Sequence, residues 1–166
     1  LARSVRDAWL LYEVMSGGTA SGGVATATRS IAGFRLGVLR RYFMDVLDDE
    51  VRQQCEAAID RLRAAGAVVE DVAVPHAPLI APVYLHIGLA EAAAYHAATL
   101  DSRPHDYTPP VRLRLEMGRY ILAQDYVRAM RGRLVLQREV DAALEGHDAL
   151  VLPTLPIQAP LIGATS

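Results

Sequence analysis

The sequence contains no lysine, since all 17 of its Lys and Arg residues are arginine. No site within these 166 residues can therefore depend on a lysine amine. Cysteine occurs once, at Cys55, which excludes an internal disulfide framework and favours a reducing compartment, so we expect a cytoplasmic protein. A strong charge of one sign is missing as well. The formal net charge of −2 gives no electrostatic reason to expect a nucleic-acid or anionic-membrane partner.

Long uninterrupted apolar runs are also absent. The longest run, Leu79 to Ala90, contains Pro82 and His86 and is too short to cross a bilayer, so we predict no membrane-spanning segment. What the sequence does have is 52% hydrophobic and 22% charged residues. This balance is typical of a folded chain with a hydrophobic core.

A strand, a helix and a second strand are predicted in the first half of the chain. Residues 34–39 alternate between apolar and other side chains, and residues 67–74 form a valine-rich segment. Between them we expect a helix that begins after Asp48 as its N-cap, buries Ile59 on its apolar stripe and ends at Gly66. This order predicts a right-handed βαβ unit with parallel strands.

Other segments also have clear local patterns. Ser4 begins a capping box that is followed by apolar residues at helical spacing. The expected elements are a helix ending near Gly17, a glycine-rich loop over 16–30, a helix over 79–100, a loop over 101–110, two helices between Thr108 and Gly146 that divide at Gly118, and a buried strand over 148–152.

Five short motifs occur in an order that resembles the C-terminal half of the amidase signature hydrolases. They are Ala-Arg-Ser-Val-Arg-Asp-Ala at 2–8, Arg-Leu-Gly-Val at 35–38, Gly-Ala-Val-Val at 66–69, Ala-Gln-Asp-Tyr at 123–126 and Asp-Ala-Leu-Val-Leu-Pro-Thr at 148–154. The resemblance implies an α/β fold, with a mixed, partly parallel sheet and helices on its faces, inside a larger α/β/α core. It also implies that residues 1–166 are a C-terminal portion of that domain, incomplete at both ends.

The resemblance implies an activity as well: hydrolysis of a small carboxamide to a carboxylate and ammonia or an amine, through an acyl-serine intermediate and without a metal or cofactor. The family activates its serine with a buried lysine, and the six serines here match neither of its serine loops. Gly17 to Gly23 looks like one of those loops, but it follows the 2–8 motif instead of preceding it, so we interpret it as a linker. We therefore expect no catalytic residue in this segment and no activity from the 166-residue chain alone.

The resemblance assigns substrate recognition to this half. Tyr84 matches a tyrosine that lines the acyl-side pocket, and Arg114 matches an arginine that binds a substrate carboxylate, with Arg112 as a competing choice because the alignment can slip by two residues. A guanidinium suits this role because its planar fork matches a carboxylate. The alternative is structural: Tyr84 in a core, and either arginine paired with Glu116 or Glu91.

A metal site is not predicted, because His86, Glu91 and His96 do not share one helical face.

Residues 91–96 read Glu-Ala-Ala-Ala-Tyr-His, where family members that serve in glutamyl-tRNA amidotransferase usually have Glu-Ala-Ser-x-Asn-Leu, so a small-molecule amidase is favoured. A second hypothesis is a non-catalytic, truncated binding module that pairs with another chain, or with a second copy, through a sheet edge. A third is an unrelated α/β domain whose matches are compositional.

Overall fold

The computed structural model describes residues 2–18, 30–161 and 163, and the chain divides into two compact units, residues 1–30 and 31–166. The first unit holds helix α1, Val5–Met15. Ser4 is its N-cap, with the Asp7 N–H donating to Ser4 Oγ at 3.1 Å, and Gly17 follows it with a φ of 75°. The predicted N-cap at Ser4 and the predicted end of this helix are confirmed. The predicted linker at Gly17 to Gly23 falls mostly outside the described residues.

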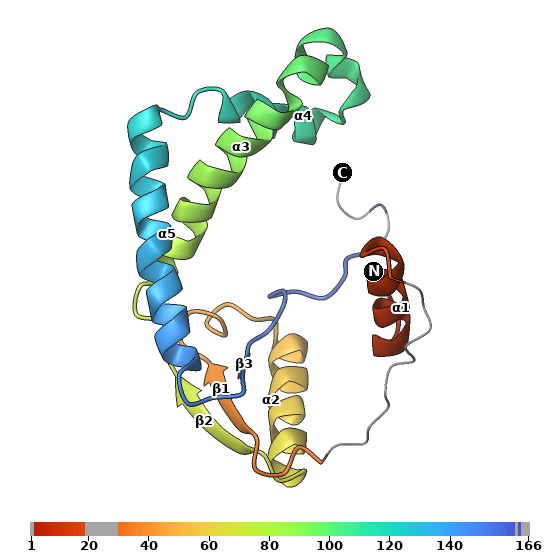
Figure 1. Cartoon of the computed structure of the whole chain (residues 1–166), viewed down its shortest axis with the longest axis vertical. Helices are drawn as coiled ribbons and strands as arrows, with labels where there is room; N and C mark the ends of the chain where they lie inside the picture. The colour runs from red at the N-terminus through yellow and green to blue at the C-terminus, as the bar shows by residue number, and fades with distance from the viewer. Residues whose placement is uncertain (1, 19–29, 162, 164–166) are drawn as a thin grey trace. The chain divides into compact units, whose positions relative to one another are not determined.

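The second unit alternates strands and helices (Figure 1). Its elements are β1 (Arg35–Leu39), α2 (Asp49–Ala64), β2 (Val68–Val72), α3 (Ile80–Ser102), α4 (Pro109–Gly118), α5 (Ala123–Leu144) and β3 (Ala149–Val151), with short 3₁₀ turns η1 (Ala77–Leu79) and η2 (Pro104–Asp106). The α/β class predicted from the sequence is confirmed.

The described strands form one parallel sheet in the order β2-β1-β3. In the centre, Leu36 lies opposite Val69 on one side and Ala149 on the other. The predicted parallel βαβ unit is therefore present. The chain passes from β1 through α2 to β2, which pairs with one side of β1, and β3 pairs with the other side of β1. The strand order therefore reverses between β1 and β3.

Helices cover both faces of this sheet. On one face, Ile59 of α2 packs in a buried cluster with Val38 of β1 and Met44. On the other face, Ala143 of α5 packs with Leu39 of β1. Successive residues of β1 thus point to opposite cores, as the period of two in a strand requires.

One local expectation is confirmed in part and another was wrong. Asp48 occupies the N-cap position of α2 as predicted, but its side chain makes no capping hydrogen bond; its backbone N–H donates to the carbonyl of Pro156 at 2.9 Å. The segment expected to be a loop over 101–110 is partly helical, because α3 continues to Ser102 and η2 follows it. Alanine favours a helix without an apolar stripe. The spacing of apolar residues therefore did not indicate that α3 continues to Ser102.

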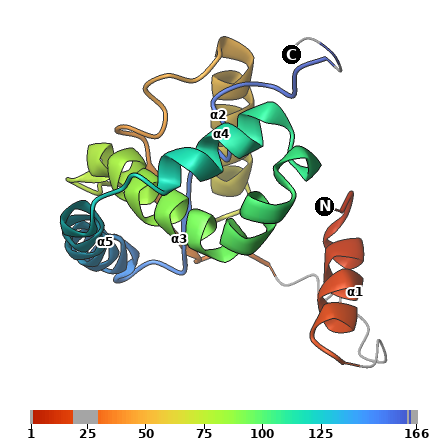
Figure 2. The ribbon, with the colours of Figure 1, turned by 90° about the horizontal axis from the view of Figure 1, so that it is seen from above.

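Helices α3 and α5 contact each other and run in opposite senses, diverging toward the start of α5 (Figure 1), and α5 is seen nearly end-on in Figure 2. The Tyr126 hydroxyl of α5 donates to Glu91 Oε1 of α3 at 3.0 Å, which joins the two helices midway along α3. The pKa of Tyr126 is raised, chiefly by this hydrogen bond.

The helical stretch from Ala77 to Ser102 is long and apolar enough, by length and composition, to cross a membrane. The sequence analysis predicted no membrane-spanning segment because it considered only the apolar run from Leu79 to Ala90, which Pro82 interrupts. In the structure this stretch contacts both α4 and α5 and carries Glu91 in its middle, bonded to a neighbouring helix. These contacts join the stretch to two other helices, while most of its apolar window is not buried.

Helix α4 lies close to α3 at Gly118, where an added Cβ would lie 2.1 Å from the backbone oxygen of Leu89. We expect Gly118→Ala to lower the free energy of unfolding by about 2 kcal/mol or more, because backbone cannot rotate away as a side chain can. Gly88→Ala is the matched control. Its Cβ would meet nothing nearer than a ring carbon of Tyr84 at 3.5 Å, so it should gain up to about 1 kcal/mol of helix propensity. Urea unfolding of the two variants measures the difference, and equal stabilities would contradict the close approach.

The start of α3 is fixed to α5 by Glu139. This carboxylate accepts hydrogen bonds from the backbone N–H of His76 at 2.8 Å and from its ring Nδ1. The bonds from the His76 ring and backbone hold the pKa of Glu139 below its ordinary value.

A pH dependence follows from this contact. Because the pKa of Glu139 is lower in the folded state than in the unfolded state, its contribution to stability is complete above the ordinary pKa of 4.5 and is lost as the pH falls below it. We expect Glu139→Gln to reduce the loss of stability between pH 5 and pH 3, roughly the window in which carboxyls titrate. Glu145→Gln, which removes an exposed carboxyl outside this contact, is the control. Thermal unfolding at several pH values checks this, and parallel profiles for the wild type and Glu139→Gln would contradict it.

Candidate functional site

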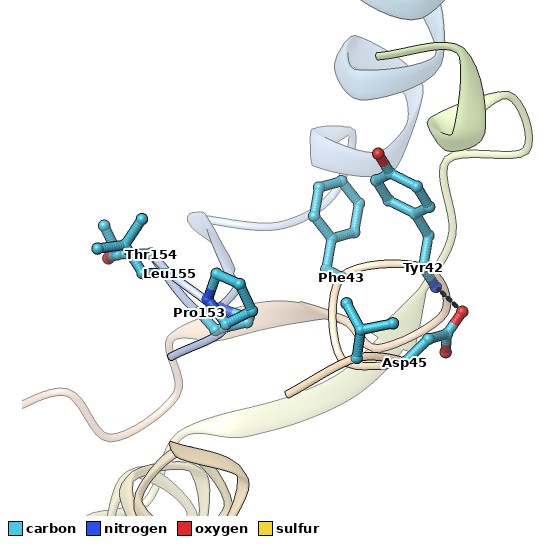
Figure 3. A pocket seen from close by; sticks show the side chains of 8 residues that line it. Tyr42, Phe43, Asp45, Pro153, Thr154 and Leu155 are labelled. Atoms are coloured by element: carbon cyan, nitrogen blue, oxygen red, sulfur yellow. Dashed lines mark hydrogen bonds between the residues drawn. The ribbon is translucent and has the colours of Figure 1, made fainter. Parts of the chain in front are cut away.

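The carboxyl ends of the three parallel strands meet at one edge of the sheet, where ligands bind in open α/β folds. A pocket of about 470 Å³ lies there, between the segments that follow β1 and β3 (Figure 3). We call it the carboxyl-edge pocket. Its lining residues are Tyr42, Phe43, Asp45, Val46, Pro153, Thr154, Leu155 and Pro156. The pocket thus lies where the strand order reverses, between β1 and β3.

The walls of the carboxyl-edge pocket are mostly apolar. Tyr42 and Phe43 stand side by side after β1, and Pro153 and Leu155 lie across from them (Figure 3). The polar side-chain groups in the lining are the Tyr42 phenol, the Asp45 carboxylate and the Thr154 hydroxyl. An apolar cleft with a few polar groups has the composition of a small-molecule site.

Tyr42 has an unusual backbone. Its φ is 73°, and among the described residues it is the one non-glycine residue with a positive φ. Its backbone N–H donates to Asp45 Oδ2 at 3.0 Å. Its ring meets that of Phe43 edge to face, with centroids 5.2 Å apart and an interplanar angle of 87°.

Arg40 fixes the segment that carries these rings. Its Nε donates to Asp71 Oδ1 at 3.0 Å, and its Nη1 bonds Glu56 of α2. The hydrogen bond to Glu56, followed by that to Asp71, raises the pKa of the guanidinium. One side chain thus joins the end of β1 to both α2 and β2.

Tyr84 lies on α3 and is 70% exposed, so its alternative interpretation as a core residue does not hold in this chain. It lines a second pocket of about 380 Å³ between α3 and α5, which we call the helix pocket. The other lining residues are Ile80, Val83, Ile87, Gly88, Glu91, Arg133 and Leu136.

Arg112 and Arg114 both lie on α4, the first half-buried and the second exposed. Neither guanidinium pairs with a described acidic residue. The partners proposed for them are engaged elsewhere, because Glu116 lies 3.7 Å from Arg119 and Glu91 accepts from Tyr126. The lining of the two pockets includes neither arginine, so the structure does not bring Arg112 or Arg114 together with Tyr84.

The histidines of α3 have structural partners. His86 Nδ1 bonds the carbonyl of Pro82 at 2.7 Å, and His96 Nδ1 bonds the Tyr107 hydroxyl at 3.0 Å. Within the described part of the chain, no group of three or more His, Cys, Asp or Glu side chains could hold a metal ion.

Sequence reasoning missed the residues of the carboxyl-edge pocket. Tyr42 and Phe43 follow one predicted strand and Thr154 follows another, and the carboxyl ends of parallel strands share an edge, so the signal was available. Arg128 pairs with Asp125 at 3.3 Å. Arg133 has no ion pair with a described residue and lines the helix pocket.

Comparisons with known proteins give a consistent picture. The family model "Amidase" matches residues 1–166. An amidase of Pseudomonas putida is 43% identical over 135 residues, covering 81% of this chain and 29% of that protein. A glutamyl-tRNA(Gln) amidotransferase subunit of Roseiflexus sp. is 32% identical over an alignment of 199 residues, covering 100% of this chain and 41% of that protein. A crystal structure of an amidase superposes with a TM-score of 0.79 at 32% identity, over 98% of this chain and 36% of that one. The chain spans less than half the length of these relatives.

We predict that Arg40 and Arg41 differ in their effect on stability. Arg40→Ala removes an arginine bonded to two carboxylates and should lower the free energy of unfolding by about 1 kcal/mol, a small value because the pairs are partly exposed. Arg41→Ala removes an exposed arginine without an ion pair to any described residue and should change it by less than about 0.5 kcal/mol. Urea unfolding measures both. Equal effects would show that the Arg40 bonds do not hold this segment in solution.

Proposed function

This chain belongs to the amidase family, and we propose that the protein it forms hydrolyses a small carboxamide to a carboxylate and ammonia or an amine. The observation that carries the proposal is the family match over residues 1–166, joined to a pocket at the carboxyl edge of a parallel sheet. Within such an enzyme, we assign this segment to the wall of the substrate pocket.

The reaction would proceed by acyl transfer. A serine oxygen attacks the amide carbonyl, the C–N bond breaks, and the nitrogen leaves with a proton as ammonia or an amine. Water then adds to the ester, and the C–O bond breaks to release the carboxylate and restore the serine hydroxyl. Because residues 1–166 contain no lysine, a lysine base of the family type would have to come from outside this segment.

Substrate recognition is assigned to Tyr84 and Arg114, with Arg112 as the alternative arginine. Tyr84 is exposed at a pocket, and both guanidinium groups are without an ion pair to the described residues. A cation that no carboxylate of the protein neutralises is suited to bind a carboxylate of the substrate.

A second candidate function is a non-catalytic module that pairs with another chain or with a second copy. Large apolar side chains that are exposed on the second unit favour it, among them Tyr95 at 85% and Leu113 at 62%. A relative that is named as one chain of an amidotransferase also supports a partner chain.

The test uses the polypeptide as its gene encodes it, with ammonia release measured on a panel of primary amides. We expect hydrolysis, and we expect Arg114→Ala to raise KM about tenfold for an amide that carries a carboxylate, because a charge-assisted hydrogen bond is lost. A neutral amide should be affected much less. Arg131→Ala, which removes an exposed arginine of α5, is the matched control.

Two results would count against the proposal. Amide hydrolysis by the 166-residue chain alone, abolished by Ser102→Ala, would show that the segment carries its own nucleophile. If instead the encoded polypeptide hydrolyses no amide and co-purifies with another chain, the binding module is the correct function. An intact mass of the encoded protein close to 18.0 kDa would favour that second outcome.

A further inference from the structure

We infer that the carboxyl-edge pocket selects substrates with a neutral, planar apolar group, that the Tyr42 and Phe43 rings form the selecting wall, and that Asp45 is a positioning residue for Tyr42. This inference rests on the proposed function and names the group of the amide that the carboxyl-edge pocket would take, apart from the contacts assigned to Tyr84 and Arg114. It depends on the backbone of Tyr42, on the anchoring of the two rings and on the charge of the lining.

The first observation is the backbone conformation of Tyr42. A φ of 73° costs a residue with a Cβ on the order of 1 kcal/mol, whereas glycine adopts it freely. The chain places glycine at other positions with positive φ, such as Gly33 and Gly66. A tyrosine at this turn therefore keeps a large ring here at a cost in backbone energy, and strained residues of this kind cluster at ligand sites.

The second observation is the contact that offsets this strain. The backbone N–H of Tyr42 donates to Asp45 Oδ2 at 3.0 Å, which closes a tight turn and fixes the direction in which the Cα–Cβ bond of Tyr42 leaves the backbone. Asp45 thus acts on a ligand through Tyr42, by holding the left-handed turn in place.

The third observation is that the rings are anchored from behind. Tyr42 and Phe43 pack against the buried cluster that joins Leu39 of β1 to Ala143 of α5. Their edge-to-face contact limits the motion of both rings. On the pocket side they present a rigid aromatic wall, which binds a ligand at little cost in conformational entropy.

The lining also determines the chemical class of the ligand. Pro153, Leu155 and Pro156 form apolar surface across from the rings, and a volume of about 470 Å³ exceeds what a methyl group needs. Asp45 is the one charged residue in the lining, so an anionic group would be repelled. The pocket therefore suits the phenyl group of an amide such as benzamide better than the methyl group of acetamide or a second carboxylate.

The experiment measures the selectivity of the polypeptide as its gene encodes it, as the ratio of kcat/KM for benzamide to that for acetamide. We expect Tyr42→Gly to lower this ratio about tenfold, since an aromatic contact is removed. We expect Tyr42→Phe to retain it. Tyr120→Gly, which removes an exposed tyrosine away from both pockets, is the control and should leave the ratio unchanged.

The role of Asp45 is tested by rescue. Asp45→Ala should lower the ratio mainly through a higher KM for benzamide, and Asp45→Asn, which keeps an accepting oxygen, should restore it. In the Tyr42→Gly background, Asp45→Ala should have no further effect on the ratio, because the ring that Asp45 positions is gone. A purely structural role would lower kcat for both amides in either background.

Failure of this inference can be separated from failure of the proposed function. If both amides are hydrolysed and Tyr42→Gly leaves the ratio unchanged, the inference is overturned and the amidase proposal stands. If no amide is hydrolysed, that proposal fails, and saturation-transfer NMR with benzamide decides the inference alone. Loss of saturation transfer in Tyr42→Gly but not in Tyr120→Gly would support the aromatic wall, and equal transfer in both variants and the wild type would overturn it.

Discussion

Strand β1 pairs in parallel with a neighbour on each side, and the arrangement of the second unit depends on this pairing. Because β2 and β3 run in the same direction as β1, the segments after β1 and β3 emerge at one edge, although more than 100 residues separate them in the sequence. The helices must then cross back over the sheet faces, α2 on one side and α5 on the other. A pocket between β1 and β3 is a consequence of this topology and needs no further device to create it.

The pocket wall combines a rigid support with a strained element. Arg40 joins the end of β1 to Glu56 and Asp71, so the backbone enters the next turn from a fixed position. Two residues later the chain adopts a left-handed conformation that tyrosine does not favour. Stability alone would place glycine or asparagine there, as at helix ends and tight turns. The tyrosine is better explained by what its ring contacts than by what its backbone prefers.

Elements with strong local signals could be predicted from the sequence, and contacts that need the tertiary fold could not. The capping box at Ser4 and the βαβ order around Ile59 depend on residues close in sequence, and both are present. Asp48 occupies the N-cap position of α2, but its side chain makes no capping hydrogen bond, and the bond from its backbone N–H to Pro156, more than 100 positions away, has no local signature in the sequence. The φ of Tyr42 has no sequence signature. Glu116 lies four residues from Arg112 and three from Arg119, so helical spacing alone allowed either pair, and the structure pairs it with Arg119.

The absence of lysine limits the chemical roles that residues 1–166 can have in a substrate site. An arginine side chain stays protonated at any physiological pH, so it can bind a carboxylate or neutralise a charge but cannot take a proton from a nucleophile. Every side chain in residues 1–166 that is a permanent cation is of this kind. Under the proposed function, a segment built in this way would hold and orient a substrate, through Arg114 or through the aromatic wall after β1, and proton transfer would be left to groups that can titrate. The pocket, and guanidinium groups without an ion pair to the described residues, agree with that proposed role in recognition, and the proposed chemical step would then require residues of another kind.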